Sequence, residues 1–177
     1  MAVGCYPGSF NPPTVAHLAI ADAARRACAL DRVDLVVSRV ALGKEDVVVP
    51  PFDQRVRVLQ DVVAARSSWL GLVVSDHQLL VDVAAGYDVL VLGADKWDQV
   101  LDPRFYGGSS DARDAAVVAL PHVALAPRPG HEHVDAPAGA TVLELDPSLR
   151  DASSTAVRAG RTDWMVDEAR ASGLWSS

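Results

Sequence analysis

Short apolar segments alternate with segments of helical spacing along most of the chain, and this alternation constrains the fold more than any other feature. The apolar runs expected to be strands are 2–6, 33–40, 70–75, 88–93, 122–126 and 141–145. The segments expected to be helices are 14–29, 52–65, 78–85, 111–119, 153–160 and 163–172. Because parallel strands need crossover connections, usually helices, this order predicts an α/β fold: a doubly wound parallel sheet with helices on both faces.

Two helix starts carry residues that can cap them. Thr14 follows two prolines and is expected to cap the helix at 14–29. Asp53 is expected to cap the helix at 52–65. The loosest stretch, 127–140, is rich in proline and glycine and is expected to be a surface loop.

Composition narrows the class of protein. The chain has 177 residues, so we expect residues 1–177 to form one domain. With 50% hydrophobic and 22% charged residues, the composition excludes intrinsic disorder. The net charge is −7 without a basic cluster, so we expect no nucleic-acid partner. No apolar run reaches the ~18 residues of a membrane helix, so we expect no membrane partner.

The cysteines and the beginning of the sequence bear on location. The stretch MAVGCYPGSF lacks the basic-then-apolar layout of a signal peptide. Cys5 and Cys28 are too few for a disulfide framework, and both are expected to be reduced thiols in the core. The sequence therefore predicts a cytoplasmic protein.

Three segments carry unusual chemistry, and ligands bind beyond the carboxyl ends of the strands in sheets of this kind. The first segment, GSFNPPTVAH, follows the first expected strand. Gly8 permits a close backbone approach to a ligand, and the following helix directs its positive end at the same space. Thr14 and His17 are three residues apart and share a helix face. The segment is either a phosphate cradle or an ordinary turn with a capping Thr and a core His.

The other two segments are weaker when taken alone. GADKW places the carboxylate of Asp95 at the end of the strand at 88–93. There it either binds ribose hydroxyls or only caps the start of a helix. DASSTAVR opens a helix with hydroxyls and amides suited to an anion, and Arg158 follows within reach. The alternative interpretation of DASSTAVR is a common helix-capping sequence followed by a solvent-exposed Arg. The triplet 131–133 has two His residues around a Glu, but no Cys or third His lies close, so no metal site is predicted there.

Taken together, the three segments resemble the nucleotidyltransferase superfamily of the HIGH type, the cytidylyltransferase-like proteins. The first signature, G-x-F-[DN]-P-x-[HT]-x-x-H-[LI], is matched by Gly8, Phe10, Asn11, Pro12, Thr14, His17 and Leu18. The last, [IV]-S-S-[TS]-x-[IV]-R, is matched by Ser153, Ser154, Thr155, Val157 and Arg158. Two positions depart from the superfamily: Ala16 replaces a frequent Gly, and Ala152 replaces Ile or Val. The GAD string is similar to that of nicotinate and nicotinamide mononucleotide adenylyltransferases.

The resemblance implies a Rossmann-like fold, ATP with Mg²⁺ bound mainly through its phosphates, and transfer of AMP to a phosphorylated small molecule, nicotinate or nicotinamide mononucleotide. It implies that catalysis rests on Thr14, His17, Lys44 and Arg158. It implies nucleotide contacts from Gly8, Ser9, Phe10, Gly93, Asp95, Ser153, Ser154 and Thr155. It implies acceptor contacts from Arg55, Arg128 and an aromatic side chain, for which Tyr106 and Trp97 compete.

Three alternatives stay open at this stage. The stretch LLVDVA is similar to phosphopantetheine adenylyltransferase, so the acceptor can be phosphopantetheine. The nucleotide donor can be CTP, or the chain can be a non-catalytic nucleotide-binding relative. Relatives are often oligomeric, and the sequence leaves homo-oligomer formation open.

Overall fold

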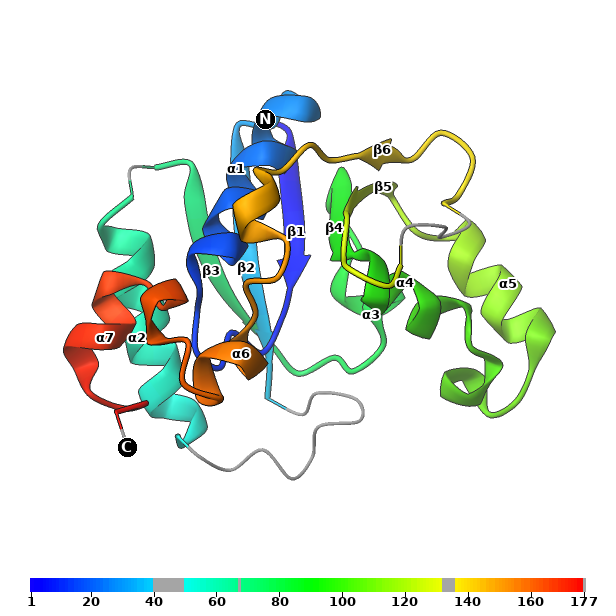
Figure 1. Ribbon diagram of the computed structural model, residues 1–177. Coiled ribbons are helices and arrows are strands. Elements are labelled where there is room, and N and C mark those ends of the chain that lie inside the picture. The colour runs from blue at the N-terminus through cyan, green and yellow to red at the C-terminus, as the bar shows by residue number, and fades with distance from the viewer. Residues whose placement is uncertain (40–49, 67, 132–135, 177) are drawn as a thin grey trace.

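The computed structural model describes residues 1–39, 50–66, 68–131 and 136–176. Six parallel strands form one sheet in the order β3-β2-β1-β4-β5-β6 (Figure 1). The strands are β1 (Val3–Pro7), β2 (Arg32–Ser38), β3 (Leu70–Ser75), β4 (Val89–Gly93), β5 (His122–Ala126) and β6 (Thr141–Val142). The predicted doubly wound α/β fold is confirmed.

Helices connect the strands. The α-helices are α1 (Val15–Ala27), α2 (Phe52–Ala64), α3 (Leu80–Val83), α4 (Ala94–Leu101), α5 (Ser110–Val118), α6 (Ser154–Arg158) and α7 (Asp167–Ser172). Short 3₁₀ helices are η1 (Pro103–Tyr106), η2 (Pro147–Leu149) and η3 (Thr162–Trp164). No described helix is long and apolar enough to cross a membrane.

Neighbouring strand residues pack on opposite faces of the sheet, which gives two cores. Tyr6 and Val91 lie in one core with residues of α1, α2 and α7. Cys5 and Leu90 lie in the other with residues of α3 and α4. Burial, with a smaller contribution from the charge of Asp34, raises the pKa of Cys5 to about 12, so this thiol stays protonated at neutral pH.

Local predictions hold where side chains decide the structure. Thr14 is the N-cap of α1, as expected. Asp53 is not a cap: α2 begins at Phe52 with Pro51 as N-cap, which places Asp53 in the first turn, where its charge still suits the helix dipole. Cys5 is buried, whereas Cys28 is half-buried against the core. Both thiols are free.

The structure departs from the sequence predictions at three elements. The predicted helix at 163–172 is broken into η3 and α7, because Met165 bridges Thr14 and the amide of Val166 donates to Pro13 O at 3.3 Å. The predicted strand at 141–145 is paired as a strand only over Thr141–Val142. Helix α4, which the sequence analysis did not predict, begins directly after β4.

The strand order reverses between β1 and β4, which pair with each other at the centre of the sheet. In doubly wound sheets, the carboxyl end of the strands at such a switch point is where ligands bind. Pro7 ends β1 and Gly93 ends β4, so two of the three predicted segments meet there.

Candidate active site

The loop between β1 and α1, residues 8–14, forms the floor of the candidate site. The amide of Gly8 donates to Val36 O at 3.0 Å, which ties the loop to β2. Phe10 has φ +42°, a left-handed conformation that costs a non-glycine residue roughly 1–2 kcal/mol. A loop with this strain persists only when its surroundings hold it in place.

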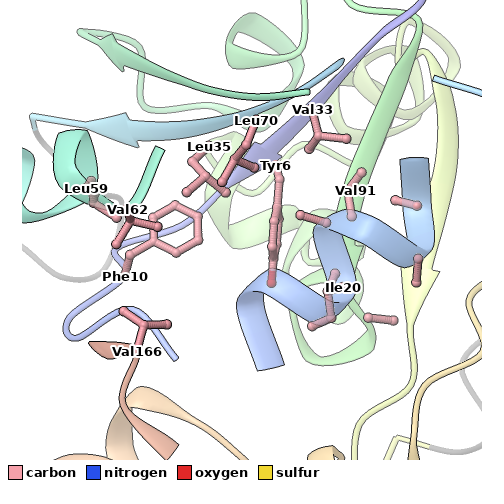
Figure 2. Close-up of a cluster of buried hydrophobic side chains, with 14 of the residues drawn as sticks. Tyr6, Phe10, Ile20, Val33, Leu35, Leu59, Val62, Leu70, Val91 and Val166 are labelled. Carbon is pink, nitrogen blue, oxygen red and sulfur yellow. The ribbon is translucent and has the colours of Figure 1, made fainter. Parts of the chain in front are cut away.

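The side chain of Phe10 supplies part of that hold. It is 1% exposed, and Figure 2 shows its ring among Leu59 and Val62 of α2. The ring meets those of Tyr6 and His17 edge-on, at centroid distances of 5.5 and 5.0 Å. Phe10 was predicted to bind the nucleotide, but its side chain belongs to the core, so only its backbone can face a ligand.

Gly8 is required by this packing. A Cβ atom on Gly8 would lie 2.8 Å from Cζ of Phe10, closer than real Cβ atoms approach a carbon. The glycine therefore lets the loop close over the Phe10 ring.

Thr14 and His17 form a reciprocal cap at the start of α1. The amide of His17 donates to Thr14 Oγ1, and the amide of Thr14 donates to His17 Nδ1 at 3.0 Å. A nitrogen that accepts from an amide carries a lone pair, so the proton of the neutral ring is on Nε2. The cap thus orients His17 and fixes Nε2–H as a hydrogen-bond donor.

The third predicted segment lies against this loop. Ser153 is the N-cap of α6, and its Oγ accepts from the amide of Ala156 at 3.1 Å. Ser154 Oγ donates to Pro12 O at 2.7 Å, and the Arg158 guanidinium donates to Asn11 O. Residues almost 150 positions apart are thereby brought together, as the motif order predicted.

Thr155 is the exposed member of the same turn. Its Oγ1 accepts from Arg158 Nη2 at 3.3 Å, which holds the guanidinium across the start of α6. Its hydroxyl and the Arg158 guanidinium can both meet an anion from solvent.

Asp95 lies in the first turn of α4, at the carboxyl end of β4, and its side chain is 49% exposed. A Cβ atom on Gly93 would lie 2.4 Å from Asp95 Oδ1, so the carboxylate lies over the glycine. Burial raises the pKa of the Tyr6 hydroxyl. The charge of Arg128 lowers this pKa and that of Asp95 raises it, so both charged groups interact with the Tyr6 hydroxyl.

Arg128 lies with the nucleotide segments, whereas the sequence analysis expected it at the acceptor. Its Nη1 donates to Ala152 O at 3.2 Å, and its Nε lies 3.9 Å from Asp95 Oδ1. Arg128 therefore connects the end of β5 to the residue just before the Ser153 cap. Ala152, where the superfamily has Ile or Val, is fully buried.

A pocket opens to solvent beside the loop on the α3 and α4 side. Its walls are mainly apolar, and it is lined by Pro7, Gly8, Ser9, Ser38, Gln78, Leu79, Leu80, Val83, Leu92, Lys96, Gln99, Val100, Phe105 and Tyr106. Gly8 and Ser9 belong to the loop, so the pocket and the loop 8–14 share a wall. Such a mostly apolar cavity with few polar groups suits a small organic ligand.

Of the two competing aromatic residues, the structure places only Tyr106 in the pocket. Trp97 is 1% exposed and packs in the core below α4. The prediction that Trp97 contacts the acceptor is wrong, because its position on α4 turns its ring towards the sheet. Burial raises the pKa of Tyr106, so its hydroxyl is neutral at pH 7.

Arg55, for which the resemblance implied an acceptor contact, is buried. Its Nη1 donates to Ser9 O at 3.1 Å, and its guanidinium stacks on the ring of Phe52. Burial lowers the pKa of Arg55. Its Nε atom is buried and has no hydrogen-bond partner among the described residues. Arg55 thus supports the loop from below and does not line the pocket.

Two features considered in the sequence include residues outside the described part of the chain. Lys44, implied to be catalytic, lies there, and so do Glu132 and His133 of the triplet 131–133. His131 is described, and its Nδ1 lies 2.6 Å from Asp98 Oδ2. Within the described residues no three His, Cys, Asp or Glu side chains gather as a metal site would require.

Several residues of the site had no sequence signal. Ser38, Gln78, Lys96 and Gln99 reach the pocket from β2, the segment before α3 and α4. They share no motif, so only the fold brings them together. Asn11 was matched as part of the first signature without a role, and it proves to be 2% exposed and bonded to Arg158.

The fold and site define a nucleotide-binding α/β protein of the doubly wound type. The family model for cytidylyltransferase-like proteins matches residues 5–160, so the chain belongs to this family of nucleotidyltransferases.

Curated relatives and solved structures point to different members of the family. The chain is 35% identical over 98 residues to the phosphopantetheine adenylyltransferases of Dinoroseobacter shibae and Ruegeria pomeroyi. The match covers 52% of this chain and 54% and 56% of those two proteins, so it spans about half the length of each.

The structural comparison concerns the whole fold. The chain is similar to Plasmodium falciparum nicotinic acid mononucleotide adenylyltransferase complexed with NaAD, with a TM-score of 0.69 and 15% identity. That match covers 98% of this chain and 97% of the other. The same enzyme complexed with APC gives a TM-score of 0.65 and 15% identity over 98% of this chain and 94% of that one. At this identity the likeness concerns the fold alone.

Gly93→Ala tests the arrangement at the end of β4. We expect the added methyl group to displace the Asp95 carboxylate and to weaken Mg·ATP binding about tenfold, measured by isothermal titration calorimetry. Asp95→Ala is the matched control, and adding Gly93→Ala to it should cause no further loss. Additive losses would show that Gly93 acts independently of Asp95.

Proposed function

We propose that the protein is an adenylyltransferase that moves AMP from ATP to the phosphate of a pyridine mononucleotide and releases pyrophosphate. The observation that carries this proposal is the junction of the loop 8–14 with α6 at the sheet's switch point. Ser154 and Arg158 contact the carbonyls of Pro12 and Asn11 there, and Gly8 and Ser9 of the same loop line the pocket. Two anion-binding segments and an organic pocket are thus combined in one site.

The chemistry requires alignment and charge neutralisation. An oxygen of the acceptor phosphate attacks the α-phosphorus of ATP, and the bond from that phosphorus to the bridging oxygen of pyrophosphate breaks. The acceptor oxygen is already anionic at neutral pH, so no side chain needs to remove a proton. The protein contributes by holding the two phosphates in line and by placing donors around the developing charge.

The residue roles follow from the positions of the donors. His17 Nε2–H lies at the start of α1, where it would contact the α- and β-phosphates. Thr14 is fully buried, so it would act by holding His17 through the cap. Arg158 would meet the departing pyrophosphate, together with Lys44 as the family resemblance implies. Ser154 and Thr155 would hold the β- and γ-phosphates. Asp95, over Gly93, would accept hydrogen bonds from the ribose.

Mg²⁺ would enter with ATP. The described residues hold no cluster of three metal-ligating side chains, and the hydroxyl and guanidinium groups around the junction suit phosphate oxygens better than a bare cation. When bound, Mg²⁺ would neutralise phosphate charge and hold the triphosphate in one conformation.

The acceptor assignment is supported by the GAD sequence and by Tyr106 in the pocket, and the fold shared with a nicotinic acid mononucleotide adenylyltransferase is compatible with it. An aromatic ring at the pocket wall can stack against a pyridine ring.

The free thiols agree with the predicted cytoplasmic location. This location stays a prediction, and so does assembly into homo-oligomers.

A second candidate acceptor is phosphopantetheine. Two curated relatives of 35% identity carry that activity in their names. Leu79, Leu80 and Val83 also give the pocket an aliphatic wall that suits a pantetheine arm.

Pyrophosphate release decides between these proposals. The protein is incubated with Mg·ATP and, in separate reactions, with nicotinate mononucleotide, nicotinamide mononucleotide or phosphopantetheine, and each reaction is repeated with CTP. Release with a mononucleotide and ATP is the expected result. Release with phosphopantetheine alone would assign the second acceptor, and ATP binding without release in any reaction would contradict adenylyl transfer to these acceptors.

His17→Ala removes the Nε2–H donor at the start of α1. We expect kcat to fall about a hundredfold, because the α-phosphate loses a donor in the transition state. The melting temperature should fall as well, because the Thr14 amide loses its acceptor and the Phe10 ring loses a contact, so kcat is measured well below that temperature. Near-normal turnover would exclude His17 from the mechanism.

Tyr106→Ala tests the pocket. We expect the KM for the acceptor to rise about tenfold and the KM for ATP to change by less than about twofold, since only the acceptor would contact this ring. Tyr106→Phe, which keeps the ring, should behave like the wild-type protein. Equal rises in both KM values would indicate that Tyr106 only supports packing.

A further inference from the structure

The segment formed by residues 165–176, which we call the α7 arm, contacts the strained loop 8–14 at three successive points. Met165 forms a bridge with Thr14, and the amide of Val166 donates to Pro13 O at 3.3 Å. The indole Nε1–H of Trp175 donates to Asn11 Oδ1 at 2.7 Å. The two ends of the arm therefore both contact the loop.

The arm is itself fixed to the body of the protein. Arg66 at the end of α2 binds Glu168 of α7 through two hydrogen bonds, of 2.8 and 3.1 Å. Ala169 and Val166 are buried in the core, and Figure 2 shows Val166 close to Phe10. Trp175 thus reaches Asn11 from a segment that is anchored to Arg66 and to the core.

Asn11 is the residue at which the arm and the nucleotide segments meet. Its side chain accepts from Trp175, and its carbonyl accepts from Arg158. The residue is 2% exposed, so water cannot readily replace a lost partner, and a buried polar group without its partner tends to move. A shift of Asn11 would move Phe10, whose left-handed backbone precedes it, and the acceptor of Arg158 at once.

We propose that Trp175 is a positioning residue of the reaction, which holds Asn11 and thereby keeps the loop 8–14 and Arg158 aligned for phosphate transfer. This inference rests on the proposed function. Trp175 touches no substrate in this account. Its effect passes through the hydrogen bond between its indole and Asn11.

The test compares two tryptophan substitutions. Trp175→Phe keeps an aromatic ring but removes the N–H donor. Trp164→Phe is the matched control, because Trp164 lies just before the arm and stacks with Arg161. We expect Trp175→Phe to lower kcat about tenfold with the KM for ATP within about threefold, as misalignment predicts. Trp164→Phe should leave both values near those of the wild-type protein.

A second readout does not depend on activity. Hydrogen exchange of peptides covering residues 8–14 should become faster in Trp175→Phe and stay unchanged in Trp164→Phe. In an Asn11→Ala background, Trp175→Phe should have no further effect on exchange or kcat, because the shared hydrogen bond is already absent.

Several outcomes would overturn the inference. These are a lower melting temperature with unchanged kcat and loop exchange, or an equal effect of Trp175→Phe in the Asn11→Ala background. If the wild-type protein released no pyrophosphate with any acceptor, the proposed function would fail by itself. Loop exchange would then decide the role of Trp175: unchanged exchange in Trp175→Phe would overturn it, and faster exchange would support the hold on the loop.

Discussion

The hydrogen bonds that join the loop 8–14 to α6 are the constraint on which the site depends. Arg158 and Ser154 reach the carbonyls of Asn11 and Pro12, and no other pair of predicted segments is tied so directly within the described residues. The loop is strained at Phe10, so it needs these contacts to keep its shape. In return, the contacts place the start of α6 beside the start of α1, and two segments suited to phosphate face one space.

The other features of the site follow from that junction and from the strand order. Because β1 and β4 are neighbours, Asp95 at the end of β4 lies across from the loop. Arg128 links Asp95 to Ala152, just ahead of the α6 cap. On the other side of the loop the pocket opens, lined in part by Gly8 and Ser9 of that loop. A donor nucleotide and an acceptor would therefore meet at the loop.

The sequence predicted the sheet and the cap at Thr14, because hydrophobic periodicity and capping residues are local signals. The meeting of the three segments was predicted from the rule that ligands bind at the carboxyl ends of the strands and from the family resemblance. It failed where long-range packing decides. Trp97 and Tyr106 are both aromatic residues after the GAD string, yet α4 turns one into the core and η1 leaves the other at the pocket. The break between η3 and α7 likewise arises from backbone bonds to the loop, which no local pattern encodes. The sequence identified Arg128 as a cation of the site, but only the fold shows that it contacts Ala152.

The central claim is that the triphosphate binds at the junction between α1 and α6. A crystal structure with Mg²⁺ and a non-hydrolysable ATP analogue tests it most directly. We expect phosphate oxygens within hydrogen-bond distance of both His17 and Arg158, with the ribose at Asp95. A triphosphate bound in the pocket beside Tyr106, or one that contacts His17 without Arg158, would contradict it.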